Sequence, residues 1–139
     1  MARKFKDLVA WQLGMQLHQW VIEFSERPRV RRDRRYCDQL RDASSGISRN
    51  VAEGFGRWTH RDFHSLLRVA RSSHMETESL LDDAVIRGYL SEVERRQIGP
   101  LIGRCGKAIA ALMRSLRERP DRPRTTRRRT SSRRRPGTR

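Results

Sequence analysis

The chain has 139 residues, with 32 Lys and Arg against 16 Asp and Glu, so its formal net charge is +16. This length allows one domain with a hydrophobic core and appended segments. The cationic excess favours a polyanionic partner, nucleic acid before a membrane surface; the alternative is an arginine-rich codon usage that reflects no partner.

Cysteine usage and hydropathy indicate in which cellular compartment the protein is expected. Cys37 and Cys105 stand far apart, outside any zinc-binding spacing, and predict reduced, buried thiols instead of a disulfide framework. The N-terminal residues are charged, and no apolar run reaches the length of a membrane span. We therefore expect a cytoplasmic protein without a signal peptide or a membrane anchor.

The first predicted helix covers residues 8–26, with Asp7 as its N-cap and an end near Pro28. Its apolar residues recur at helical spacing, namely Leu13, Leu17, Trp20 and Phe24. Residues 27–35 hold six arginines and one aspartate, and like charges at this density predict a solvated connection. Four of its arginines are candidates for phosphate contacts: Arg31, Arg32, Arg34 and Arg35.

The second predicted helix has a near-heptad stripe of Tyr36, Leu40, Ala43, Ile47 and Val51. Small residues over 44–48 lower helix propensity, which indicates that a neighbouring helix approaches closely there. Gly54 and Gly56 are expected to supply positive φ at the exit, and Arg57 stands four residues after Glu53 for an ion pair.

Asn50 and Glu53 are expected to turn toward the core as a structural polar network that fixes helix register. We expect partners on the third helix, with Glu76 as the acidic member and Ser72 or His74 nearby. The functional alternative makes Glu53 an acid or base, but no partner nucleophile stands at a telling spacing.

The third predicted helix begins with Thr59 as N-cap and Asp62 in its first turn. Its apolar stripe ends in a Schellman-type turn at Gly88, with Leu90 folding back. The stripe contains Phe63, Leu67, Ala70, His74, Thr77, Leu81 and Ala84.

The fourth predicted helix is capped by Ser91 and Glu94, and Pro100 predicts either a start near residue 99 or a kink. Its stripe contains Ile98, Ile102, Cys105, Ile109, Leu112 and Leu116. Residues 119–139 carry ten arginines and one aspartate without a large apolar side chain, which predicts a disordered basic tail. The remaining chain is still basic.

Four amphipathic helices with short connections predict an all-α fold, an antiparallel up-down-up-down four-helix bundle over residues 1–118. No strand-like alternation competes with this pattern.

A set of motifs spread over residues 5–116 resembles one known family. The most specific stretch is Asn50-Val51-Ala52-Glu53-Gly54, and the others are Phe5–Leu8 leading to Trp11-Gln12, Gln39-Leu40-Arg41, Phe55-Gly56-Arg57, Ser72-Ser73 and Gly88-Tyr89-Leu90. The chain thus resembles the four-helix-bundle proteins encoded inside intervening sequences of bacterial 23S ribosomal RNA genes.

This resemblance implies a ring-shaped homopentamer with no established enzymatic activity. A more remote resemblance, to the accessory proteins of diversity-generating retroelements, implies binding to nucleic acid and to a reverse transcriptase. The chain departs from the closer family in its very basic residues 27–35, in Ser48 where proline is common, and in its arginine-rich tail.

The third predicted helix carries a row of basic residues opposite its apolar stripe. Arg61, His64, Arg68 and Arg71 fall within an arc of about 80°, and Arg57 extends it backward. Arginine guanidinium groups pair with phosphate oxygens, so the row is a candidate nucleic-acid surface, although a charged row is more often a solvated face. The tail adds the candidates Arg127, Arg128 and Arg129. Each of the three tryptophans, Trp11, Trp20 and Trp58, could stack on an unpaired base, but tryptophan side chains more often pack within the protein.

No catalytic residue, metal or cofactor is expected. The residues three before the four histidines are Met15, Arg57, Arg61 and Arg71, so the Glu-x-x-His pair of di-iron bundles is missing. The sequence therefore predicts a non-enzymatic bundle that binds RNA or DNA through basic faces without reading the base sequence. The resemblance implies in addition that the bundle is oligomeric and belongs to a larger nucleoprotein with a reverse transcriptase or ribosomal RNA. The alternative is a structural scaffold whose basic tail docks on acidic proteins.

Overall fold

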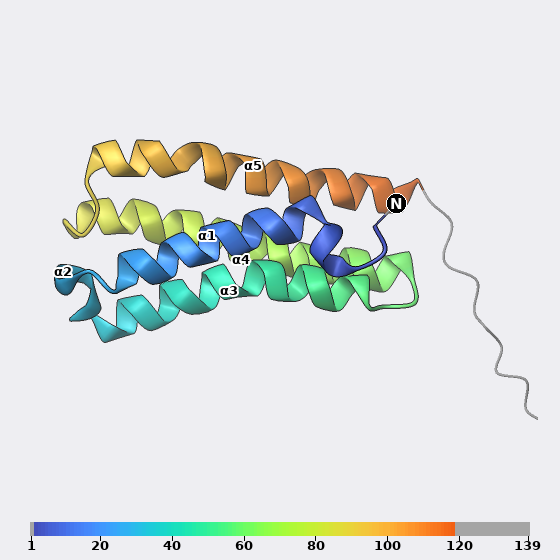
Figure 1. The fold of residues 1–139 in the computed structure, drawn as a ribbon, viewed down its shortest axis with the longest axis horizontal. Coiled ribbons are helices and arrows are strands. Elements are labelled where there is room, and N and C mark those ends of the chain that lie inside the picture. The colour runs from blue at the N-terminus through green and yellow to red at the C-terminus, as the bar shows by residue number, and fades with distance from the viewer. Residues whose placement is uncertain (1, 119–139) are drawn as a thin grey trace, which may run out of the picture.

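Four long helices pack side by side in antiparallel order in the computed structural model, which describes residues 2–118 (Figure 1). These helices are α1 (Val9–Ser25), α3 (Arg34–Phe55), α4 (His60–Ile86) and α5 (Glu92–Arg117). A 3-10 turn, η1 (Phe5–Asp7), precedes them, and the short α2 (Pro28–Arg31) links α1 to α3. The predicted up-down-up-down bundle is confirmed, and the described residues contain no strand.

Three helix ends follow the predicted capping chemistry. The side-chain oxygens of Thr59 and Ser91 accept hydrogen bonds from backbone N–H groups at the starts of α4 and α5. At the end of α4, Gly88 has φ 76°, and the Tyr89 N–H donates to the carbonyl oxygen of Ala84 at 2.9 Å. These contacts are the Schellman motif, which requires a residue that tolerates positive φ.

The start of α1 differs from the prediction. Asp7 is not its N-cap, because its carboxylate lies in η1 and accepts from the backbone N–H groups of Arg3 and Lys4 at 3.2 and 3.3 Å. Leu8, which has extended backbone angles and no capping side-chain hydrogen bond, stands before Val9 instead.

Residues 27–35 are also more ordered than their charge predicts. Pro28 opens α2, and Val30 is only 1% exposed because it packs into the core. Asp33 then caps α3 by accepting from the Tyr36 N–H. A single apolar side chain and one cap therefore fix a segment that the charge density alone would leave in solvent.

The glycines near the end of α3 serve packing and not a left-handed exit. Gly54 is buried inside α3, and a Cβ added there would lie 2.6 Å from Cδ2 of Phe63 on α4. Gly56 has φ −76°, and Gly88 is the described residue with positive φ. Pro100 lies within α5, which already begins at Glu92, so the predicted start near residue 99 is wrong.

Small residues bring the helices close together, as predicted. A Cβ at Gly46 of α3 would lie 2.6 Å from Oγ of Ser73 on α4, and one at Gly14 of α1 would lie 2.9 Å from Cγ2 of Ile47. Around these contacts the core is formed by stripes from all four long helices, including Leu17, Ile47, Leu67 and Ile109.

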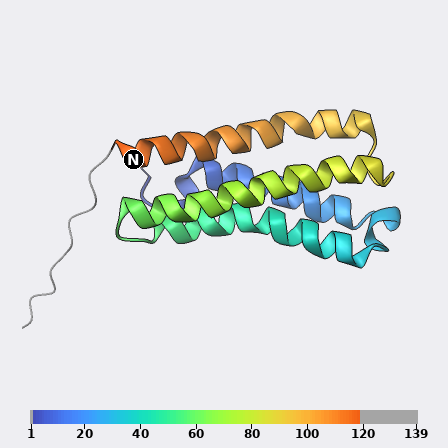
Figure 2. The ribbon, with the colours of Figure 1, turned by 180° about the vertical axis from the view of Figure 1, so that it is seen from behind.

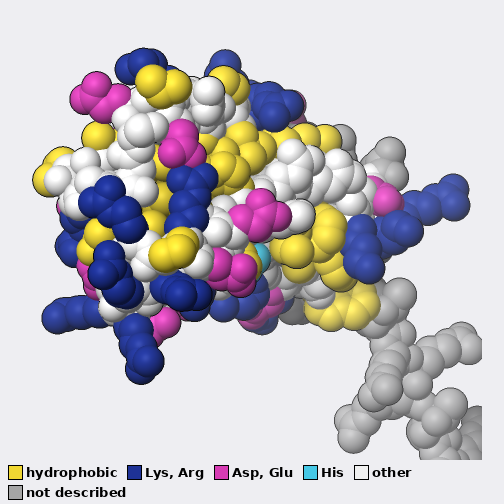
Figure 3. Space-filling view, turned by 60° about the vertical axis from the view of Figure 1, so that its left-hand side comes forward, with side chains coloured by type: hydrophobic (Ala, Val, Ile, Leu, Met, Phe, Trp, Pro, Cys, Tyr) yellow, Lys and Arg dark blue, Asp and Glu magenta, His cyan; other side chains and the backbone are white. Residues whose placement is uncertain are grey.

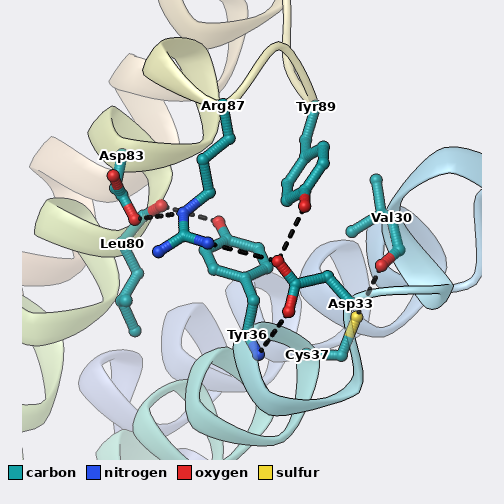
Figure 4. A network of polar contacts seen from close by, with 8 residues as sticks. All are labelled: Val30, Asp33, Tyr36, Cys37, Leu80, Asp83, Arg87 and Tyr89. Carbon is teal, nitrogen blue, oxygen red and sulfur yellow. Dashed lines mark hydrogen bonds and ion pairs between the residues drawn. The ribbon is translucent and has the colours of Figure 1, made fainter.

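A polar network joins the start of α3 to the turn between α4 and α5 (Figure 4). The carboxylate of Asp33 accepts from the Tyr89 hydroxyl at 2.7 Å and from the Arg87 guanidinium at 3.2 Å. Arg87 also donates to Asp83 at 2.7 Å, and the Tyr36 hydroxyl donates to the buried carbonyl oxygen of Leu80 at 2.6 Å. The hydrogen bond from Tyr89 leads the contacts that lower the pKa of Asp33.

We expect Gly54→Ala to lower the free energy of unfolding by about 1–3 kcal/mol, because the added methyl group overpacks against the Phe63 ring. The matched control is Gly103→Ala in α5, where an added Cβ meets nothing within 4 Å. That change should raise the free energy by about 0.5–1 kcal/mol, because alanine favours a helix interior. Urea unfolding of both variants measures the difference, and a stabilising Gly54→Ala would contradict the packing described.

We expect Asp33→Asn to lower the melting temperature at neutral pH and to matter progressively less in acid. A carboxyl group whose pKa is lowered by folding adds stability above its unfolded pKa, and this stability is lost as pH falls through the folded pKa. Melting temperatures of parent and variant should therefore converge between pH 7 and about pH 3. The exposed Asp38→Asn is the control, and a pH-independent difference for Asp33→Asn would disprove the linkage.

Candidate nucleic-acid interface

The predicted basic residues divide between the two ends of the bundle. Arg31, Arg32, Arg34 and Arg35 surround α2, whereas Arg57, Arg61 and His64 lie where α3 passes into α4. The 22 residues of α3 separate the two groups, which corresponds to about 33 Å of helix. The structure therefore does not bring the predicted residues into one surface.

The α2 end carries mixed charge. All four predicted arginines there are exposed, and Figure 3 shows acidic side chains among the Lys and Arg groups that surround this end. Several of its cations are paired: Arg27 with Glu94 at 2.7 Å, Arg95 with Asp82 at 2.7 Å, and Arg87 with Asp33. A polyanion approaching this end meets carboxylates as well as guanidinium groups.

The opposite end holds a hollow of about 430 Å³ between the first turns of α4 and the last turn of α5, called the α4–α5 groove below. Figure 2 shows α4 and α5 moving apart toward this end. The groove contains three of the predicted residues, Arg61, His64 and Arg68, and adds Arg117 from α5. Its remaining lining residues are His60, Ser65 and Leu116.

Arg117 is a groove residue that the sequence pattern did not single out, although a signal existed. It directly follows Leu116, the last buried residue of the α5 stripe, so it stands at the edge of the face that α5 turns toward its neighbours. The residues that Arg117 meets depend on how far α4 and α5 diverge. This divergence cannot be predicted from the apolar periodicity of either helix.

The described lining of the α4–α5 groove is cationic. Among residues 2–118, no acidic residue lines it, and none of Arg61, Arg68 and Arg117 forms an ion pair. Burial lowers the pKa of His64, and the nearby charges of Arg117 and Arg68 lower it further. The groove therefore offers several unpaired donors from two helices to an anion.

One buried atom of the groove lacks a hydrogen-bond partner. The Nε2 atom of His64 is shielded from solvent, and no described residue donates to it or accepts from it. Buried polar atoms are normally hydrogen-bonded, so this nitrogen is an exception within the described residues.

The other predicted basic residues are placed less favourably. Arg57 forms the predicted ion pair with Glu53 at 2.8 Å, and both side chains are about half exposed, so the pair adds little stability. Arg71 lies further along α4, in a second hollow of about 530 Å³ that also contains Arg68. That hollow is lined in part by the exposed apolar side chains of Val69 and Met75.

The expected polar network of Asn50, Glu53 and Glu76 does not form within the described residues. The Asn50 amide donates to the Gly46 carbonyl oxygen of its own helix at 2.7 Å, Glu53 points to solvent, and Glu76 is exposed on α4. The close approach of α4 at Gly46 and Gly54 leaves no room between the helices for a buried carboxylate.

The other polar residues considered for that network have different partners. His74 contacts α5, where its Nε2 donates to the Ile102 carbonyl oxygen at 2.8 Å, and Ser72 donates to the Arg68 carbonyl oxygen in its own helix. Register between α4 and α5 is therefore supported by a histidine contact to backbone and not by an acidic network.

Two further observations concern residues 2–118 alone. No helix there is long and apolar enough to cross a membrane, and no three His, Cys, Asp or Glu side chains are grouped to hold a metal ion. The predicted tail contacts, Arg127, Arg128 and Arg129, lie outside the described residues.

Comparison with known families gives one finding. The family model described as "23S rRNA-intervening sequence protein" matches residues 6–111. This range includes all of α1, α3 and α4 and most of α5. A search among curated proteins finds no match.

Proposed function

The chain belongs to the family of 23S rRNA-intervening sequence proteins, and on this premise we propose that it is a non-enzymatic, oligomeric protein that binds RNA or DNA. The observation that carries the proposal is the α4–α5 groove, where Arg61, Arg68 and Arg117 lie together and have no acidic partner in the part of the chain that the structure describes. Since the family is related to ribosomal RNA, RNA is the first ligand to test.

Recognition through this groove depends on charge and shape. Guanidinium groups pair with phosphate oxygens, and phosphates carry no sequence information. We therefore expect sequence-independent affinity that falls steeply with salt.

Self-association is the second part of the proposal. Val69 and Met75 are 47% and 60% exposed and lie on one side of α4, where they line the hollow that contains Arg68 and Arg71. Exposed apolar side chains gathered in a hollow favour a protein contact. The family resemblance implies a ring of five subunits, in which each copy would cover this face of the next.

A ring would also repeat the α4–α5 groove in each subunit, and avidity would strengthen a weak phosphate contact. The larger assembly, a ribosomal RNA nucleoprotein or a complex with a reverse transcriptase in the cytoplasm, stays a prediction. The genes that neighbour this one would discriminate between the two.

We expect the combined change of Arg61, Arg68 and Arg117 to Gln to weaken binding of a structured RNA and of a DNA duplex. The salt slope should fall by about one for each phosphate that the variant no longer neutralises. Arg104→Gln, on an exposed part of α5 outside the groove, is the matched control. Fluorescence anisotropy across a salt series measures both quantities.

The same titration with a chain ending at Glu118 tests the alternative function. If the shortened chain keeps its affinity, the groove of the bundle suffices for binding. If binding disappears with residues 119–139, or if the triple variant binds like the parent, the groove is not the nucleic-acid site and the scaffold function is favoured.

We expect Val69→Glu combined with Met75→Glu to reduce the native mass of the assembly to that of one chain, 16.4 kDa, because charges would replace the apolar contact. Val93→Glu is the control, since Val93 is similarly exposed but lies in the first turn of α5. Native mass spectrometry gives the masses. A double variant that keeps the parent mass would show that this face of α4 is not a subunit interface.

A further inference from the structure

The three tryptophans have different surroundings. Trp11 packs edge-on against Phe5 with ring centroids 5.4 Å apart, and Trp20 stacks on Phe24 at 5.1 Å, so both support the core. Trp58 is 63% exposed, and within residues 2–118 its ring has no aromatic or cationic partner. Most of this large apolar ring therefore lies in water, which packing within the bundle does not explain.

Trp58 lies beside the α4–α5 groove. It belongs to the turn between α3 and α4, two residues before His60, which lines the groove. Two residues of chain span at most about 7 Å between Cα atoms, so the backbone of Trp58 lies close to a residue that lines the groove. In the sequence, Arg57 precedes Trp58 and Arg61 follows His60, so this turn is rich in cationic residues.

A stacking ring next to a cationic groove is the combination that binds single-stranded nucleic acid. Unpaired bases stack on exposed aromatic rings while basic side chains hold the backbone, whereas a duplex keeps its bases stacked on each other. The cationic surroundings of Trp58 favour a polyanion over a protein surface as the group that covers it.

The groove supplies donors for the phosphates of the same ligand. Nε2 of His64 is shielded from solvent, so a phosphate oxygen would reach it only after the His64 ring moves. Arg61 and Arg68 on α4 and Arg117 on α5 lie around this position as further donors.

We propose that this end of the bundle binds an unpaired segment of nucleic acid, with Trp58 stacked on a base and the α4–α5 groove holding the adjacent phosphates. The inference rests on the proposed function and narrows its ligand from nucleic acid in general to single strands, loops or ends. RNA and DNA strands share the chemistry, so the test contains both.

The test is binding of the full chain to labelled oligouridine and oligothymidine of about 12 nucleotides, and to a duplex of equal length, by fluorescence anisotropy. We expect Trp58→Ala to lower affinity for the single strands about 5- to 150-fold and to leave the duplex within about twofold. Trp58→Phe should restore most of the affinity, because a phenyl ring also stacks. Ile86→Ala is the matched control, since Ile86 is 85% exposed at the opposite end of α4.

The outcomes separate this inference from the proposed function. If the full chain binds no nucleic acid, both are wrong. If it binds the duplex as tightly as the single strands and Trp58→Ala lowers neither, the inference is wrong while the proposed function stands. A changed native mass for Trp58→Ala without nucleic acid would make Trp58 a subunit contact and would also overturn the inference. Weaker binding confined to one strand type supports it and identifies the ligand as RNA or DNA.

Discussion

The structure depends on the close approach of α3 and α4. Gly46 and Gly54 bring the backbone of α3 so near that Ser73 and Phe63 of α4 occupy the space of the missing side chains. This contact sets the rotation of α4 about its axis, since Phe63 must point into α3. Once Phe63 points inward, residues on the other side of the helix, Arg61 and Arg68 among them, must face outward and toward α5.

The rotation of α4 then decides which charges are compensated. At the α2 end, Asp33 and Glu94 form ion pairs with arginines of other helices, and Asp83 pairs with Arg87 at the end of its own helix, α4. At the other end α4 and α5 diverge, and Arg68 and Arg117 line the groove there with no carboxylate from residues 2–118 beside them. Both ends of the bundle are rich in arginine. Carboxylates pair with arginines at the α2 end, whereas the arginines at the other end can bind an anion.

Helix content and helix order could be predicted from the sequence because both depend on local patterns. The apolar stripes, the caps at Thr59 and Ser91 and the left-handed Gly88 are set by residues within a turn or two of each other, and the structure confirms them. The predictions for Asp7 and Gly54 are wrong because the roles of these residues depend on partners. The carboxylate of Asp7 accepts hydrogen bonds within η1, and Gly54 packs against Phe63 of α4. The burial of Val30 between exposed arginines likewise depends on a core to which distant segments contribute.

The sequence by itself determined the all-α bundle, its family and its basic character, because apolar periodicity, motifs and charge are properties of the amino-acid sequence alone. Only the tertiary structure decided that the basic residues form two separate ends, that Arg117 joins Arg61 and Arg68, and that Trp58 is the tryptophan left in solvent. The physical reason is that a helical pattern gives the direction of each side chain around its own axis. The distance and rotation between two axes, which place side chains of α4 and α5 in one groove, arise from packing across the whole core.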